Sequence, residues 1–343
     1  MNWKRLKAEA APGIWTLVGS APCAIAEKIK SLAAISVLAV CLNAGATQAE
    51  ALAPNSQEPP IPSEPPTSSL ALERIANGKR VFYATGGCTC HTNYPGEGED
   101  APELAGGRGL ETPFGIFFST NITPDPETGI GKWSDADFIR AMREGLSPKG
   151  EHYFPVFPYS AFAGLLDQDL VDLKSYLDSL PPVTRINRAP DAPFPFSWRA
   201  TISGWKWMNF EMPSREPAPE KSAEWNRGRY LVDAAAHCGE CHTPRTLTGG
   251  LDASLHLAGS QDGPEGQLAP NITPHETTGI GRWSRPDLVW YLETGLKPDG
   301  DDTQGLMSEV IEHGYANLPA SDLEAMAVYL RTVPAIENHV KGE

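Results

Sequence analysis

The sequence is short of cysteine and of basic residues for its length. Its 343 residues include six cysteines, and 28 Lys and Arg stand against 43 Asp and Glu, for a formal net charge of −15. Six cysteines are too few for a disulfide scaffold of this size, and the acidic balance argues against a nucleic-acid partner. With 41% hydrophobic residues the chain is not disordered throughout, and its length predicts two domains.

The N-terminal region lacks an apolar run long enough to cross a bilayer. Residues 32–42 form a short apolar run, which follows a basic region and precedes small residues. A run well under ~20 residues in this setting is typical of a signal peptide. We predict a signal peptide at residues 1–49 and a periplasmic location, with an uncleaved anchor as the alternative. Residues 50–69 are rich in proline, which predicts an extended tether.

A repeat organises the rest of the chain. Residues 120–134 recur as residues 270–284, and both segments contain Asn-Ile-Thr-Pro and end on Thr-Gly-Ile-Gly, a basic residue, Trp and Ser. Self-similarity of this kind predicts two copies of one domain. We place them at residues 70–182 and 222–336, joined by an aromatic linker at residues 183–221 that is expected to pack across both.

The apolar spacing in the first copy is helical. A helix is expected around residues 70–81, and Ser134 with Asp137 forms the expected N-cap pair of another helix, which Gly145 ends. Leucines at helical spacing over residues 170–180 predict a third. The residues taken to mark the first of these helices are Leu70, Leu72, Ile75 and Val81.

The second copy follows the same pattern, so the predicted fold class is all-α. Ser321 and Glu324 are expected to form a capping box, ahead of an apolar stripe that includes Met326. Long loops rich in Gly and Pro, such as residues 96–113, separate the helices of each copy. A domain of about 110 residues with so much loop has a thin core, which a large cofactor could complete.

The cysteines of the second copy indicate that cofactor. Cys238, Cys241 and His242 form a C-x-x-C-H sequence, the attachment motif of c-type haem. Positions i and i+3 share one face of a helix, so both thiols can reach the haem vinyl groups while the adjacent histidine turns toward the iron. A redox CxxC or half of a zinc site is the alternative.

A methionine is the expected second axial ligand of this haem. Met307 and Met326 are the methionines that follow His242. Met326 belongs to the apolar stripe of the last helix, whereas Met307 is expected in a loop from which it could approach the iron. We therefore predict Met307 as the ligand, which would complete an electron-transferring iron centre.

The first copy is less regular. Its motif, Cys88-Thr89-Cys90-His91, is one residue shorter, and a C-x-C spacing separates the sulfurs by about 200° on a helix. We expect a haem held at least by Cys90, with His91 as proximal ligand. Cys88 is the second thioether if it bonds at all, and two thioethers would require local distortion of the backbone.

The distal ligand of the first haem is less clear in the sequence. The repeat aligns Met307 with Phe157, which cannot bind iron. The nearby His152 is the best substitute, and Tyr153 or an open position are the alternatives. Met142 is expected in a helix core.

These features resemble the multihaem cytochrome c subunits that accept electrons from membrane-associated alcohol, gluconate and related dehydrogenases. The resemblance rests on the paired haem motifs, the Asn-Ile-Thr-Pro repeat and the linker sequence at 195–206, and it covers residues 70–334. It implies two tandem class I cytochrome c domains, each wrapped round one haem c and loaded in the periplasm. Family members commonly carry a third cytochrome domain and a C-terminal membrane anchor, whereas this sequence ends soon after its second domain. The short first motif and Phe157 also depart from the family pattern.

An electron carrier is the function that this combination predicts. The expected partners are a dehydrogenase subunit and a terminal acceptor with a basic docking surface, toward which the acidic charge would steer the protein. Membrane association is expected only through partners or an uncleaved N-terminus. One alternative is a dihaem oxidoreductase, of peroxidase or sulfur-compound type, with an open iron at haem 1. Another is a structural or sensory module whose first site binds no haem.

Overall fold

The computed structural model describes residues 69–93 and 102–340. The predicted signal peptide at 1–49 and all of the tether at 50–69 except its last residue lie outside these ranges. The elements from the start of the described chain to the linker are α1 (Ser69–Ala84), η1 (Gly86–His91), β1 (Gly109–Thr112), β2 (Gly115–Phe118), α2 (Asp135–Glu144), α3 (Tyr159–Phe162), α4 (Asp167–Asp178) and α5 (Ala200–Asn209). Those that follow are α6 (Ala223–Arg229), η2 (Tyr230–Ala235), α7 (Gly239–His242), η3 (Ala253–Leu255), η4 (Pro264–Gly266), α8 (Arg285–Thr294), α9 (Leu306–His313), η5 (Tyr315–Asn317) and α10 (Ala320–Leu330).

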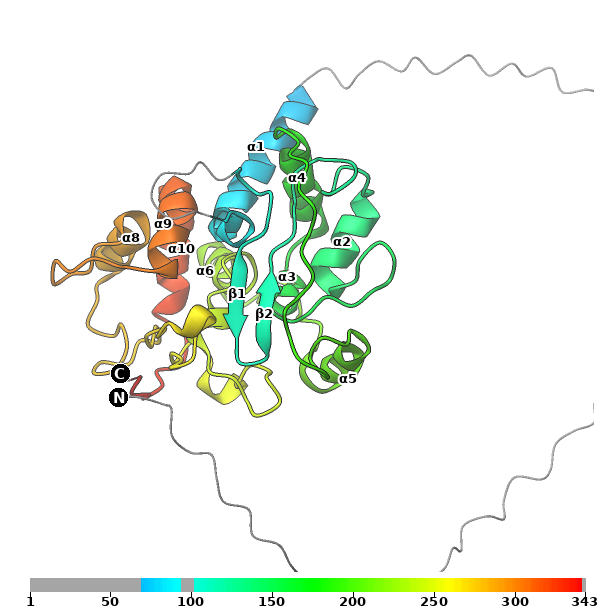
Figure 1. Ribbon diagram of the computed structural model, residues 1–343. Helices are drawn as coiled ribbons and strands as arrows, with labels where there is room; N and C mark the ends of the chain where they lie inside the picture. The colour runs from blue at the N-terminus through cyan, green and yellow to red at the C-terminus, as the bar shows by residue number, and fades with distance from the viewer. Residues whose placement is uncertain (1–68, 94–101, 341–343) are drawn as a thin grey trace, which may run out of the picture. The chain divides into compact units, whose positions relative to one another are not determined.

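Two pairs of helices cross at glycines. α1 packs against α4, and α6 packs against α10 (Figure 1). A Cβ atom on Gly78 of α1 would lie 1.8 Å from the carbonyl oxygen of Asp172, and one on Gly228 of α6 would lie 2.0 Å from that of Ala325. Only glycine lets the backbones approach this closely. The two crossings bring apolar side chains of α4 and of α10 into the core.

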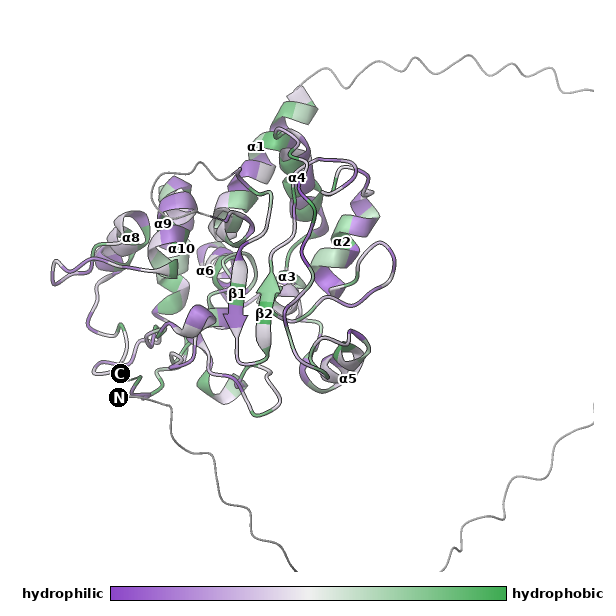
Figure 2. Ribbon diagram, viewed as in Figure 1, coloured by the Kyte–Doolittle hydropathy of each residue, from purple (hydrophilic) through white to green (hydrophobic). Residues whose placement is uncertain are grey.

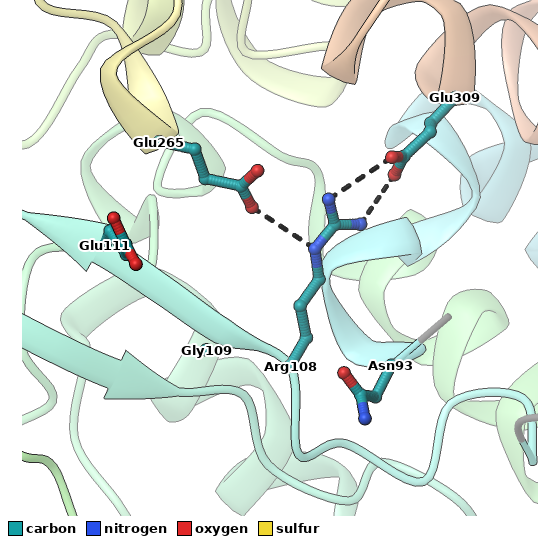
Figure 3. A pocket seen from close by; sticks show the side chains of 6 residues that line it. All are labelled: Asn93, Arg108, Gly109, Glu111, Glu265 and Glu309. Carbon is teal, nitrogen blue, oxygen red and sulfur yellow. Dashed lines mark hydrogen bonds and ion pairs between the residues drawn. The ribbon is translucent and has the colours of Figure 1, made fainter. Parts of the chain in front are cut away.

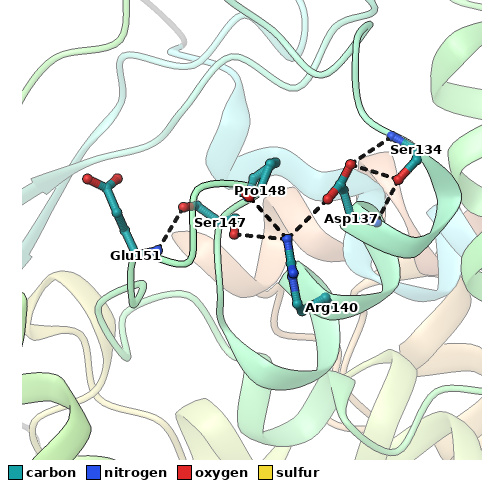
Figure 4. A network of polar contacts seen from close by, with 6 residues as sticks. All are labelled: Ser134, Asp137, Arg140, Ser147, Pro148 and Glu151. Carbon is teal, nitrogen blue, oxygen red and sulfur yellow. Dashed lines mark hydrogen bonds and ion pairs between the residues drawn. The ribbon is translucent and has the colours of Figure 1, made fainter. Parts of the chain in front are cut away.

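The predicted N-cap of the second main helix is confirmed. The Ser134 hydroxyl accepts a hydrogen bond from the Asp137 amide at 3.1 Å, and the Asp137 carboxylate accepts one from the Ser134 amide at 3.2 Å (Figure 4). Gly145 ends α2 in the left-handed region with φ 57°. Ser284 and Asp287 cap α8 in the same way. Arg140 ties α2 to the following loop, donating to Asp137 and to the carbonyl oxygen of Pro148.

One expectation about the helices was wrong. Ser321 and Glu324 do not cap the last helix, because α10 begins one residue before Ser321 and follows Pro319. The helix expected around residues 70–81 is confirmed as α1. Leu70 and Leu72 in its first turn are nevertheless 72% and 69% exposed, so that turn contributes little to the core. Helical spacing alone does not reveal whether a neighbour covers the end of a helix.

The fold is mostly helical, but it is not all-α. β1 and β2 form an antiparallel hairpin that pairs Gly109 with Phe118 and Thr112 with Gly115. Thr112 closes the turn, donating to the carbonyl oxygen of Gly115 and accepting from the amide of Phe114. β1 is largely hydrophilic and β2 hydrophobic (Figure 2), and β2 turns Phe117 into a small cluster with Phe154. Strands this short leave no alternating pattern in the sequence.

The linker contains a helix, α5, that contacts residues on both sides of it in the chain. The Trp205 indole donates to the carbonyl oxygen of Thr248 at 3.0 Å, and the Lys206 ammonium donates to that of Gly145 at 3.1 Å. Other linker aromatics are largely exposed: Phe194 at 77%, Trp198 at 58% and Trp207 at 87%. Only part of the aromatic linker therefore packs between its neighbours.

The main core is one cluster that runs across both copies of the repeat. Leu173 and Leu177 of α4, Leu231 of η2, and Leu323 and Met326 of α10 are at most 1% exposed within it. Met142 is also buried there, as predicted. Over residues 69–93 and 102–340, none of the helices combines the length and apolar character that a membrane crossing requires.

Candidate functional site

The second cysteine motif forms one turn of helix. Cys238 precedes α7, and the His242 amide donates to the carbonyl oxygen of Cys238 at 2.9 Å. This turn puts Cys238 and Cys241 on one face, and both are half-buried free thiols. Burial raises the pKa of each to about 12, unlike the low pKa of a reactive redox thiol.

The histidine of this motif is held in one tautomer. His242 Nδ1 lies 2.7 Å from the carbonyl oxygen of Pro270, which can only accept, so Nδ1 carries the proton. Burial lowers the pKa of His242, which favours the neutral ring. The lone pair of Nε2 is therefore free to bind a metal, an arrangement common among metal-bound histidines.

The histidine of the first motif is held in the same way. His91 Nδ1 lies 2.6 Å from the carbonyl oxygen of Thr120, and burial lowers its pKa as well. Thr120 and Pro270 are the first residues of the repeated segments. The repeated segments therefore begin with the two carbonyl groups that orient the histidines, a role that was not predicted from the sequence.

The residues after these carbonyls explain the Asn-Ile-Thr-Pro sequence. The Asn121 amide donates to Thr128 Oγ1 at 3.0 Å and to the carbonyl oxygen of Val183 at 2.7 Å. Asn271 makes the matching bonds to Thr278 at 3.0 Å and to Ile336 at 2.8 Å. Both asparagines are buried, so each loop is fixed next to the histidine that it orients.

The backbone of the first motif departs from helical geometry. Cys88 has φ 49°, and Gly86 and Gly87 before it also have positive φ. In the second motif only His237, just before the first cysteine, has this conformation. Thr85 Oγ1 lies 3.3 Å from Cys88 Sγ, which is half-buried, whereas Cys90 is exposed. Burial raises the pKa of Cys88 to about 11.

Met307 lies in a helix rather than in the expected loop. It occupies the first turn of α9, is partly buried and packs against the main core. The amide of the preceding residue, Leu306, donates to Gln267 Oε1 at 3.1 Å. Gln267 is three residues from Pro270, so one loop contacts both His242 and the start of α9. Gln267 was not among the residues predicted from the sequence.

His152 lies beside the linker. Its backbone pairs with Leu146, its carbonyl oxygen accepts from Arg199 at 2.6 Å, and burial with the nearby Lys206 charge lowers its pKa. Its Nδ1 atom is buried with no hydrogen-bond partner among the described residues. Among the described residues it makes no hydrogen bond or ring contact with His91, so its role as a ligand stays a prediction.

Phe157 packs among aromatic rings. Its ring centroid lies 5.7 Å from that of Tyr153 and 5.8 Å from that of Phe162, and it borders the main core. The position aligned with Met307 is therefore a packing site in the first copy.

Each copy of the repeat packs on the cysteine motif of the other. A Cβ atom on Gly87 would lie 2.4 Å from the carbonyl oxygen of His313, at the end of α9. Reciprocally, Ser160 of α3 donates to Glu240 at 2.9 Å, and the Phe162 ring lies 5.1 Å from that of His237. The environment of each motif is thus shared between the copies.

The residues of both motifs fit covalently attached haem. Each motif offers two free thiols beside a neutral histidine whose Nε2 lone pair is unused. This is the donor set of haem c, which takes thioethers from cysteine and an imidazole ligand at iron.

Known proteins with this chemistry are similar to the chain. No family model matches it. It is 42% identical over 279 residues to a protein described as "Diheme cytochrome c-type" of Cereibacter sphaeroides, covering 81% of this chain and 92% of that protein. It is 40% identical over 276 residues to the fructose dehydrogenase cytochrome subunit of Gluconobacter japonicus, covering 80% and 55%.

A third relative is the cytochrome c subunit of the quinone alcohol dehydrogenase of Gluconobacter oxydans, 36% identical over 272 residues, covering 76% and 55%. The chain spans about half the length of these two dehydrogenase subunits. The resemblance found in the sequence is confirmed, and two haem c groups are the cofactors. The chain belongs to the family of dihaem c-type cytochromes.

Proposed function

We propose that the chain is an exported dihaem electron carrier that takes electrons from a dehydrogenase partner and passes them to a downstream acceptor in the periplasm. The observation that carries this proposal is the pair of histidines fixed in the metal-binding tautomer, each beside two free thiols. Relatives named as cytochrome subunits of dehydrogenases support the choice of partner. When bound, haem c supplies a one-electron iron couple.

The second haem has the more regular set of residues. Cys238 and Cys241 would hold it through thioethers, and His242 and Met307 would bind its iron. The proposal for Met307 rests on its position in the first turn of α9. The loop that contains Gln267 and Pro270 contacts both the start of that helix and His242. A histidine and methionine pair raises the potential of a cytochrome c and favours electron transfer over substrate binding.

The first haem would be held at least by Cys90, with His91 binding its iron. Cys88 is the second thioether if it bonds, and its positive φ is the distortion that such a bond would need. His152 is the proposed distal ligand, supported by its partly buried ring with an unpaired Nδ1.

Two tandem class I cytochrome c domains, at residues 70–182 and 222–336, are the proposed architecture. The support is the set of paired features: glycine helix crossings, capping boxes and anchored histidines. The proposed signal peptide at residues 1–49 would bring the chain to the compartment where haem is attached.

The proposed redox partners dock through opposite charge. The net charge of −15 favours an acceptor with a basic docking surface, and association should slow as salt is added. Membrane association would arise through partners or an uncleaved N-terminus.

A second candidate function is a dihaem oxidoreductase with an open iron at haem 1. The observation that favours it is Phe157, which occupies the position of Met307 and packs against Phe162. In that case haem 1 would bind substrate and haem 2 would relay electrons.

Exogenous ligands distinguish the two functions. We expect the loaded carrier to bind neither CO when reduced nor cyanide when oxidised on the timescale of mixing, because both irons have two axial ligands from the chain. The measurement is stopped-flow absorbance of the holoprotein. Rapid binding at one haem would contradict the carrier and support the oxidoreductase, whereas a single haem per chain would support the structural or sensory module.

A further inference from the structure

One arginine of the first copy holds the helix that carries Met307. The Arg108 guanidinium donates to both oxygens of Glu309, at 2.5 and 3.3 Å, and its Nε donates to Glu265 at 3.2 Å (Figure 3). Glu309 lies in the first turn of α9, and Glu265 lies in η4. The three side chains line a cleft of about 400 Å³ next to Asn93.

The backbone of Arg108 is held in place independently of these side-chain contacts. Its amide donates to Ser119 Oγ at 3.1 Å, and its carbonyl oxygen accepts from the Ser119 amide at 2.9 Å, at the base of the β1–β2 hairpin. Its side chain is 14% exposed and that of Glu309 is 32% exposed. A bidentate arginine pair that is partly shielded from water constrains both distance and angle.

Helix geometry relates this pair to Met307. Residues 307 and 309 are two apart in α9, which separates their side chains by about 200° around the helix axis. When Arg108 holds Glu309 on one side, Met307 is directed to the other side. Rotation of α9 would move both residues together.

The same helix also contacts other parts of the chain at its first residue and near its middle. The Leu306 amide donates to Gln267, and Val310 lies 3.1 Å from a Cβ atom built on Gly86. These contacts limit translation of α9. The Arg108–Glu309 pair adds a charged contact from the first copy, which restrains the rotation of α9.

We propose that Arg108 is a positioning residue for the second haem: it acts from the first copy, through Glu309, to hold Met307 in the orientation that binds iron. The inference rests on the proposed role of Met307. It makes the ligation of haem 2 depend on a residue next to the first haem motif. Asn93, two residues after His91, lines the same cleft as Arg108 and Glu309, which places the end of that motif close by.

Competition with imidazole measures this positioning in the holoprotein. Imidazole replaces Met307 at the iron, and the loss of the absorption band of the Met–iron bond reports it. If Met307 is held less firmly, imidazole replaces it at a lower imidazole concentration. We expect the apparent imidazole affinity of Arg108→Gln and of Glu309→Gln to rise about tenfold. Arg108→Lys keeps the charge, so its apparent imidazole affinity should lie between those of the parent and of Arg108→Gln.

Glu265→Gln is the matched control. It removes the other carboxylate that pairs with Arg108 but leaves α9 untouched, so we expect an apparent affinity within about twofold of the parent. Equal titrations for Arg108→Gln and the parent would overturn the proposal. An equally large effect of Glu265→Gln would also overturn it, because the route through Glu309 would then not be special.

A Met307→Ala background separates this inference from the proposed function. If Met307 binds iron, Met307→Ala removes the Met–iron band, and adding Arg108→Gln should then leave imidazole affinity unchanged. An effect of Arg108→Gln that persists without Met307 would overturn the positioning role alone. A Met–iron band that survives Met307→Ala would overturn the proposed ligand and the inference with it.

Discussion

Gly228→Ala is expected to destabilise the protein by about 3 kcal/mol or more. The added Cβ would meet the carbonyl oxygen of Ala325 at 2.0 Å, and no side-chain rotation can relieve a clash with backbone. α6 and α10 would have to separate, and α6 continues through η2 to Cys238. For a chain of this size the thermal midpoint should fall by roughly 10 °C.

Gly204→Ala is the matched control for this prediction. Gly204 also lies inside a helix, α5, but nothing lies within 4 Å of a Cβ atom built there. Alanine has the better helix propensity, so we expect a stabilisation of up to about 1 kcal/mol. Calorimetry of both variants as holoproteins checks the prediction. A Gly228→Ala midpoint equal to that of the parent would mean that the helices do not cross this closely.

Met307→Ala is expected to lower the reduction potential of haem 2 by on the order of 0.1–0.2 V. The thioether sulfur favours reduced iron, and alanine offers no ligand in its place. A spectroelectrochemical titration should show one of the two haem potentials moving and the Met–iron band disappearing. The stability change should be small, because Met307 is only partly buried.

Met326→Ala should behave in the opposite way. Met326 is 0% exposed in the core, so its loss should cost about 2–5 kcal/mol of stability while both potentials stay as in the parent. If Met326→Ala instead removed the Met–iron band, the two methionines would have been assigned the wrong way round.

Local signals made part of this fold predictable from the sequence. The Ser134–Asp137 capping box is encoded within four residues and closed by Gly145, so the sequence suffices to predict α2. The Cys238–His242 turn is similarly local. By contrast, the predicted cap of α10 was wrong, and the helix begins after Pro319. A serine and a glutamate at the spacing of a capping box can equally lie inside the first turns of a helix, so the spacing alone does not locate its start.

The features that the sequence did not reveal depend on contacts between distant residues. Arg108 and Glu309 are 201 residues apart, and no periodicity relates them. The packing of His313 on Gly87 likewise joins one copy of the repeat to the other. Sequence patterns describe each copy, whereas these contacts depend on how the copies meet.

A dihaem electron carrier requires that two haems be attached to one chain. Intact-mass measurement of the purified protein after acid unfolding counts the covalently bound groups, since unfolding releases any haem that lacks a thioether. We expect the mass of the mature chain plus two haems, with Cys241 and Cys90 among the attachment sites found by peptide mapping. A mass with one haem or none would contradict the account.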